Sequence, residues 1–189
     1  MILVTGFEPF GGLTRNPSAE VAQAVAGGDV RAAVLPVDYD SVVPTLDALL
    51  ADPWDAVILM GIAIGRPQLT LERVAINFRD RQRPDNAGEV PPEPSIVPGG
   101  PAAYFATLPV DRLCARLREE GIPAAVSLSA GAYLCNASFY LARHALEARG
   151  TPCGFLHLPP TEDLACGAEP VLKSEQVRAL RVILSELTQ

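Results

Sequence analysis

Short apolar runs alternate along the chain with longer segments in which apolar residues recur every three or four positions. The runs predict strands, which cover residues 2–5, 32–37, 56–60, 124–128 and 154–158. The periodic segments predict helices at residues 18–26, 41–50, 111–120, 134–149 and 174–187. Strands that alternate with helices form a largely parallel sheet with helices on both faces. We therefore predict one domain over residues 1–189, a three-layer α/β/α sandwich whose central sheet is largely parallel but mixed.

Residues 91–109 contain repeated prolines and the pair Gly99-Gly100, so this segment cannot be regular throughout. A long irregular segment is either a lid or interface loop, or a surface connection. The sequence leaves both interpretations open.

Residues 121–142 carry no charge and are nominally long enough to span a bilayer. However, Pro123, Gly131 and Asn136 interrupt the stretch, and its pattern changes halfway from a short apolar run to a helical period. We interpret it as strand, turn and helix, and expect no membrane contact.

The chain has 189 residues with 15 basic and 22 acidic side chains, and 49% of its residues are hydrophobic. A chain of this length can bury one core without disulfides or metal. The net charge of −7 offers no positive surface to a phosphate backbone, so we expect no nucleic-acid partner. The cysteines are widely spaced and no signal peptide is recognisable, which predicts a cytoplasmic protein with reduced thiols.

The residue inventory excludes several kinds of site. Lys173 is the only lysine and no glycine-rich phosphate loop precedes it. His144 and His157 are the only histidines, and neither an H-E-x-x-H nor a C-x-x-C motif occurs, so we expect no metal and no cofactor. A G-x-S-x-G serine elbow is also absent.

Chemistry-bearing residues follow several predicted strands, and ligands of open parallel sheets bind beyond the carboxyl ends of the strands. The glycine-rich loop with Phe7 and Phe10 follows the first apolar run. Cys135 follows the fourth run, and His157 stands near the end of the last one. A cysteine and a histidine are therefore expected to converge at one edge of the sheet.

Cys135 stands at the predicted start of a helix, where the helix dipole and free N–H groups lower a thiol pKa and can hold an oxyanion. Alternatively, Cys135 is a small buried hydrophobe on one helical face. Cys114 is interpreted as a packing residue, and no dipole argument applies to Cys153 or Cys166.

His157 lies among apolar residues and is either a hydrogen-bonded core histidine or the acid that protonates a leaving amine. His144 falls on the helix face opposite Cys135 and is interpreted as solvated. Spacing alone cannot select a carboxylate partner for His157 among 22 acidic residues. Glu72, for example, is equally compatible with a surface ion pair to a nearby arginine.

Long motifs in the chain resemble the pyroglutamyl-peptidase I family, also called pyrrolidone carboxyl peptidase, whose cysteine peptidases remove N-terminal pyroglutamate. The resemblance runs nearly from end to end. It is carried by residues 5–12 (TGFEPFGG), 16–18 (NPS), 72–77 (ERVAIN), 84–88 (PDNAG), 127–136 (SLSAGAYLCN) and 155–159 (FLHLP).

The resemblance implies that Cys135 is the nucleophile, His157 the general base and acid, and Glu72 the residue that orients the imidazole. It implies that Phe7 and Phe10 line a pocket for the five-membered lactam. It also implies peptide substrates with an N-terminal pyroglutamate, no metal or cofactor, and a homo-oligomer such as a tetramer.

Two positions depart from the family pattern. Gln82 stands where family members commonly have an arginine that assists the oxyanion, and Ile62 stands where some relatives have a glutamine. We hypothesise that Arg81 or Arg83 replaces the missing arginine. In the alternative, both arginines only pair with surface carboxylates such as Asp80 and Asp85.

Two alternative functions are also compatible with the residues of the sequence. Another thiol-dependent amidase on a similar sheet would keep Cys135 and His157 without the lactam pocket. A noncatalytic small-molecule binding protein would keep the loop of Phe7 and Phe10, while Cys135 would be an unreactive core thiol.

Overall fold

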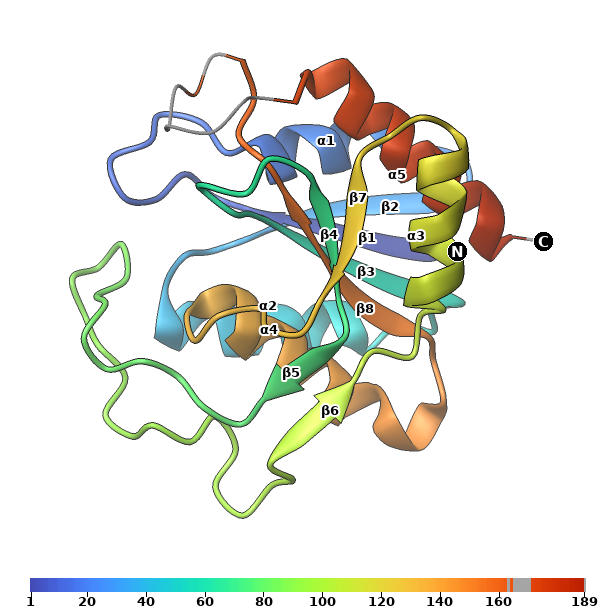
Figure 1. The fold of residues 1–189 in the computed structure, drawn as a ribbon. Coiled ribbons are helices and arrows are strands. Elements are labelled where there is room, and N and C mark those ends of the chain that lie inside the picture. The colour runs from blue at the N-terminus through green and yellow to red at the C-terminus, as the bar shows by residue number, and fades with distance from the viewer. Residues whose placement is uncertain (163, 165–170, 189) are drawn as a thin grey trace.

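A six-stranded sheet lies between two layers of helices in the computed structural model, which describes residues 1–162, 164 and 171–188 (Figure 1). Every strand predicted from an apolar run is present. In spatial order the sheet contains β2 (Val30–Leu35), β1 (Ile2–Phe7), β3 (Ala56–Ile62), β8 (Cys153–Leu158), β4 (Leu69–Glu72) and β7 (Ala124–Ser127).

The sheet is mixed, as predicted, because two strands run against the other four. β1, β2, β3 and β8 are mutually parallel, whereas β4 is antiparallel to β8 and β7 is parallel to β4. The carboxyl end of β7 therefore does not share an edge with that of β8. Cys135 therefore does not reach the site from the end of a strand that is parallel to β8. Residues 128–133 instead lead from β7 into a helix that packs on the sheet.

The helices divide between the two faces of the sheet, which confirms the three-layer arrangement (Figure 1). One face is covered by α1 (Pro17–Val25), α3 (Val110–Glu119) and α5 (Lys173–Leu187). The other is covered by α2 (Tyr39–Leu50) and α4 (Leu134–Leu146), which is followed by a short 3-10 helix, η1 (Glu147–Arg149). The helix predicted for residues 134–149 is therefore α-helical up to Leu146, and its last turn is a 3-10 helix.

The strands at the centre of the sheet are buried on both faces, which explains why they read as continuous apolar runs. Leu3 and Leu59 pack toward α2 and α4, whereas their neighbours Val4 and Ile58 pack toward α1 and α5. The alternation follows from the two-residue period of a strand. The same alternation decides which strand residues can face α4.

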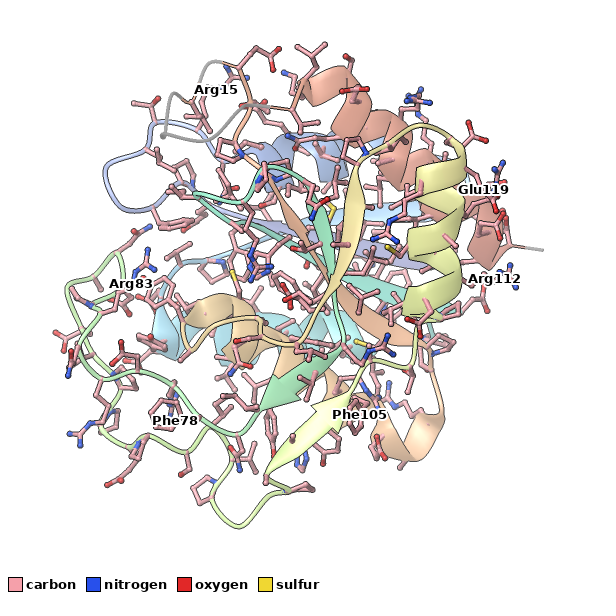
Figure 2. All side chains as sticks on the ribbon, viewed as in Figure 1. Arg15, Phe78, Arg83, Phe105, Arg112 and Glu119 are labelled. Carbon is pink, nitrogen blue, oxygen red and sulfur yellow. The ribbon has the colours of Figure 1, made fainter. Side chains whose placement is uncertain are left out.

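A second, two-stranded sheet covers the outer side of α4 and includes part of the proline-rich segment. It pairs β5 (Val74–Ile76) with β6 (Ala103–Phe105). The Asn77 side chain ties the residues between these strands together, because its Oδ1 accepts from the backbone N–H groups of Ile96 and Val97 at 2.8 and 2.9 Å. Phe78, two residues after β5, and Phe105, the last residue of β6, are both exposed (Figure 2).

The uncharged stretch 121–142 folds as the end of a loop, β7, a connection and the first part of α4. Within the ranges that the structure describes, none of the helices has the length and apolar character needed to cross a bilayer.

Candidate active site

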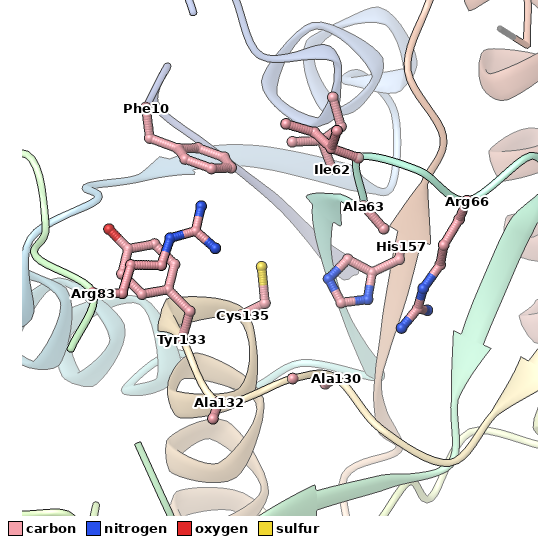
Figure 3. A pocket seen from close by; sticks show the side chains of 12 residues that line it. Phe10, Ile62, Ala63, Arg66, Arg83, Ala130, Ala132, Tyr133, Cys135 and His157 are labelled. Atoms are coloured by element: carbon pink, nitrogen blue, oxygen red, sulfur yellow. The ribbon is translucent and has the colours of Figure 1, made fainter. Parts of the chain in front are cut away.

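A cavity of about 280 Å³ opens between α4 and the ends of β3 and β8 (Figure 3). Cys135 and His157 both line it, so the structure brings together the cysteine and the histidine that the sequence singled out. Phe10, Ile62, Tyr133 and Arg83 form much of the remaining wall.

Cys135 is positioned by the first turn of α4. The N-cap residue Tyr133 makes no side-chain cap hydrogen bond, and the first backbone bond of the helix runs from Ala137 N to Tyr133 O at 3.0 Å. The earlier N–H groups of the turn, including that of Cys135, therefore lack a partner within the helix. Asn136 fixes the helix start against β5, because its Oδ1 accepts from Ile76 N and its Nδ2 donates to Ile76 O, both at 2.9 Å.

The Cys135 sulfur lies directly over Gly61 of β3. A Cβ placed on Gly61 would come within 2.7 Å of Cys135 Sγ and 3.1 Å of Phe155 Cζ. Real Cβ atoms do not approach other atoms this closely, so the absence of a side chain at Gly61 creates the space that the thiol occupies.

His157 and Glu72 form a hydrogen-bonded pair beside the cavity. His157 Nδ1 lies 2.7 Å from Glu72 Oε1, and the side chains are 6% and 0% exposed. The strand register explains the contact, because β4 and β8 align Thr70 with His157 and Glu72 with Phe155. With Nδ1 bound to Glu72, Nε2 is the ring nitrogen left for a partner in the cavity (Figure 3).

The pair is arranged so that Glu72 is ionised and His157 is neutral near pH 7. Burial opposes ionisation of Glu72, but the hydrogen bond of His157, its charge when it is protonated, and hydrogen bonds from Ser127 and Arg66 lower the pKa of Glu72 below its ordinary value. Burial lowers the pKa of His157; the Glu72 hydrogen bond opposes this shift, and the charge of Arg66 adds to it. A neutral imidazole is the form that can accept a proton.

The thiol of Cys135 differs from the expectation based on its helix-start position. Although part of the residue reaches the cavity, burial of the sulfur raises the pKa of Cys135 to about 12. Arg83 and Arg66 act in the opposite direction, and Glu72 adds to the rise. The expectation of a lowered pKa is therefore wrong for the resting site, because desolvation of the thiol outweighs the two arginines and the backbone N–H of Cys135, and the neighbouring imidazole is neutral. Among the residues that the structure describes, no hydrogen bond joins Cys135 Sγ to His157.

The aromatic wall contains one of the two predicted phenylalanines. Phe10 faces the cavity, and its ring centroid lies 6.2 Å from that of Tyr133. Phe7 is 2% exposed and packs in the core on the α2 and α4 side, since it is the last residue of a strand that is buried throughout. The assignment of Phe7 to the pocket wall is thus corrected. Sequence reasoning missed Tyr133, although its place two residues before Cys135 was a usable signal.

The two arginines that flank Gln82 occupy different surroundings. The Arg83 guanidinium lies 4.3 Å from the ring centroid of Tyr133 and 5.5 Å from that of Phe10, at the mouth of the cavity (Figure 3). Arg81 does not line the cavity, and its Nε donates to the Pro91 carbonyl at 3.3 Å. The two arginines are therefore not equivalent candidates.

The remaining candidates lie away from the cavity or outside the described residues. Cys114 and Cys153 are buried, and Cys166 falls outside the part of the chain that the structure describes. His144 is exposed, as predicted, and its Nδ1 lies 2.7 Å from the Tyr104 hydroxyl. No group of three or more His, Cys, Asp or Glu within the described ranges is placed to hold a metal ion.

A family model described as pyroglutamyl peptidase matches residues 1–186. Among curated proteins, the chain is 43% identical to a pyrrolidone-carboxylate peptidase of Thermococcus kodakarensis, over 100% of this chain and 98% of that protein. It is 45% identical to the pyrrolidone-carboxylate peptidase of Clavibacter michiganensis, over 93% of this chain and 86% of that protein.

Solved structures are similar over the same length. The pyrrolidone carboxyl peptidase from Thermus thermophilus superposes with a TM-score of 0.91 at 48% identity, covering 97% of this chain and 98% of that one. The pyrrolidone carboxyl peptidase from Thermococcus litoralis gives a TM-score of 0.88 at 34% identity, with 97% and 91% of the two chains covered.

Proposed function

The chain belongs to the pyroglutamyl peptidase family, and from that premise we propose that Cys135, His157 and Glu72 perform its reaction. The enzyme is a cysteine-type hydrolase that cleaves the amide bond after an N-terminal pyroglutamate. The observation that carries the assignment of residues is the 2.7 Å bond between His157 Nδ1 and Glu72 Oε1, beside the cavity that holds Cys135.

In the first half of the reaction, the neutral imidazole of His157 takes the proton of the Cys135 thiol as Sγ attacks the pyroglutamyl carbonyl carbon. A thiol whose resting pKa is raised needs such a base. Glu72 stabilises the imidazolium that forms. His157 then gives this proton to the departing amine as the C–N bond breaks, which leaves a thioester on Cys135.

In the second half, a water molecule attacks the thioester while His157 accepts its proton. The C–S bond breaks, the proton returns to the sulfur, and free pyroglutamate leaves. In both halves the imidazole of His157 holds a proton temporarily. The buried carboxylate of Glu72 stabilises the imidazolium in each case.

Two groups are placed to stabilise the oxyanion. The Cys135 N–H lies in the uncapped first turn of α4, where a backbone donor and the helix dipole both favour negative charge. The Arg83 guanidinium lines the same cavity, and its positive charge lowers the pKa of Cys135, so it favours negative charge at this position. We assign to Arg83 the partial charge stabilisation that Gln82 cannot supply.

The cavity wall favours a neutral, flat ring over a charged amino terminus. Phe10, Tyr133 and Ile62 offer apolar surface for a lactam. A free amino terminus would enter as a cation beside Arg83, and none of the described residues that line the cavity is a carboxylate. Burying such an unpaired charge costs several kcal/mol, which accounts for selectivity toward the blocked terminus.

Release of a fluorogenic amine from its pyroglutamyl amide, with the prolyl amide as a matched control, tests the proposed residues. The wild-type chain is expected to cleave the pyroglutamyl amide and to leave the prolyl amide intact. Cys135→Ser should fold and lose essentially all turnover, because a serine hydroxyl is a far weaker nucleophile. Retained turnover in Cys135→Ser would contradict the assignment of the nucleophile.

We further propose that residues 1–189 act as a single catalytic domain, that the enzyme forms a homo-oligomer such as a tetramer, and that it works in the cytoplasm. Peptides with an N-terminal pyroglutamate are its proposed substrates. Family membership supports these proposals, and light scattering on the purified enzyme would test the oligomeric state.

A further inference from the structure

We propose that Arg66 is a positioning residue that keeps the Glu72 carboxylate ionised and directed at His157. This inference rests on the proposed function, because it assigns the fixed cation of the same site. Arg66 belongs to the connection between β3 and β4, and its side chain reaches into the cavity wall (Figure 3).

The contacts of Arg66 converge on one carboxylate oxygen. Its Nη1 donates to Glu72 Oε1 at 2.6 Å, and the same oxygen lies 2.7 Å from His157 Nδ1. Two further bonds hold the guanidinium in place, from Nη1 to Thr70 Oγ1 at 2.6 Å and from Nη2 to Ser129 O at 3.0 Å. The guanidinium is therefore fixed by three residues on two segments, strand β4 and the connection from β7 to α4.

A fully buried carboxylate needs a permanent cation to remain charged. Glu72 is 0% exposed, so without Arg66 the charge of its carboxylate would have to be balanced by a protonated His157. His157 is neutral in the resting site, so it can donate a hydrogen bond to Glu72 but supplies no charge. An arginine does not lose its proton in proteins, so Arg66 supplies the charge in every state of His157.

Arg66 also acts on the base itself. The charged or titratable groups around His157 are Glu72 from β4, Arg66 from the preceding connection, Cys135 from α4, and Arg83 across the cavity. Glu72 favours protonation of His157, whereas Arg66 opposes it. By sharing Oε1 with His157, Arg66 keeps the imidazole from being held permanently as an imidazolium.

Arg66 could instead have only a structural role, since its bond to Ser129 ties the β3–β4 connection to the residues that lead into α4. A purely structural role would affect activity equally at all pH values. A positioning role through Glu72 and His157 must change the pH profile.

The test compares Arg66→Met, which removes the charge but keeps an apolar stem, with Arg66→Lys, which restores a cation. Arg112→Met is the matched control, because it changes the net charge equally and Arg112 projects from α3 toward Glu186, far from the cavity (Figure 2). Two measurements are made on each variant: kcat/KM against pH on the pyroglutamyl amide, and titration of the His157 ring proton by NMR. The chain has two histidines, so His144→Gln assigns the signal.

Arg66→Met is expected to lower kcat and to move the acid limb of kcat/KM upward by about one pH unit, since a neighbouring charge shifts a pKa by roughly 1–3. The NMR titration of His157 should move in the same direction, and Arg66→Lys should recover part of both effects. Arg112→Met should resemble the wild type. A uniform loss of activity with an unmoved acid limb and an unmoved His157 titration would overturn the proposal.

Two further outcomes of the experiment are a variant that does not fold and a wild-type enzyme that lacks activity. If Arg66→Met does not fold, Thr70→Val removes one anchor of the guanidinium at nearly constant volume, and a smaller shift in the same direction is expected. An unmoved titration in Thr70→Val would then count against the proposal. If the wild type fails to cleave pyroglutamyl amides, the proposed function falls, whereas the NMR titration still decides whether Arg66 controls His157.

Discussion

Cys135 Sγ occupies the space that a side chain on Gly61 would fill, since a Cβ at that position would lie only 2.7 Å from the sulfur. Two parts of the fold therefore set the position of the nucleophile. One is Gly61 in strand β3 of the central sheet, and the other is the first turn of α4, which carries Cys135. Gly61 precedes the proposed nucleophile by many residues, and no motif in the sequence links the two positions.

Gly61→Ala is expected to lower kcat by about 10²-fold, the scale of loss when a reacting atom is displaced by about 1 Å. Gly154→Ala is the matched control, because its Cβ would also meet a side chain at 2.7 Å, that of Leu108 on the opposite face of the sheet. Both variants should lose a similar amount of stability, about 1–3 kcal/mol for added core volume. Thermal unfolding and steady-state kinetics on both variants separate the two effects. Equal activity in the two variants would show that the position of Sγ does not depend on Gly61.

Phe10 and Phe7 are expected to respond differently to removal of the ring. Phe10→Ala should raise KM by an amount equivalent to about 1–3 kcal/mol, because an apolar contact to the lactam is lost. Phe7→Ala should instead reduce the free energy of unfolding by about 3–5 kcal/mol, since the ring is in the core. Steady-state kinetics and denaturant unfolding, measured on each variant, check these two expectations. The reverse pattern would place Phe7, rather than Phe10, at the substrate.

The fold was largely predictable because the sheet is buried on both faces. Such strands are continuous apolar runs, and the helices that cover them have one apolar face, so β1, β3 and β8 and all five helices follow from periodicity. The short strands β4, β5 and β6 were not predicted, although β7, which is no longer than β4, was. The direction of individual strands was also not predictable, because the apolar pattern does not show that β7 runs against β8.

The site was predictable only where a residue type is rare. One cysteine at a helix start and one of two histidines could be selected by chemistry, whereas Glu72 had to be chosen from 22 acidic residues. What selects Glu72 is the register that sets Thr70 against His157, a property of paired strands that spacing does not encode. The family resemblance supplied Glu72, and the structure explains why this carboxylate lies at the histidine.

Alkylation of Cys135 is expected to be slow at neutral pH and to accelerate as the pH rises. The pKa of the thiol is raised to about 12, so only a small fraction is thiolate at pH 7, and this fraction grows about tenfold per pH unit. Iodoacetamide labelling followed by peptide mass mapping gives the rate at each cysteine, and the buried Cys114 and Cys153 should label little. A Cys135 rate that is already constant at neutral pH would instead indicate a resting thiolate–imidazolium pair.

The acid limb of kcat/KM is expected below the ordinary imidazole pKa of about 6.5. Burial lowers the pKa of His157, so the neutral base persists as the pH falls and is lost only below the usual range. Glu72→Gln removes the anion whose hydrogen bond and charge favour protonation of His157, and it should move the acid limb still lower while reducing kcat by about 10²-fold or more. This shift is opposite in sign to that expected for Arg66→Met. An acid limb that moves upward in Glu72→Gln would contradict the assigned roles.

Arg83 and Arg81 flank Gln82, and only one of them should contribute to turnover. The Arg83 guanidinium lies at the cavity against Tyr133 and Phe10, whereas Arg81 bonds to the Pro91 carbonyl outside it. Arg83→Met keeps the apolar stem against the rings but removes the cation, so kcat should fall by about 10²-fold, the scale of losing one oxyanion donor. Arg81→Met carries the same change of charge and should retain the wild-type kcat. Binding of a lactam inhibitor should change little in either variant, because the ground-state carbonyl carries no full negative charge. Wild-type turnover in Arg83→Met would leave the N–H groups at the start of α4 as the main donors to the oxyanion.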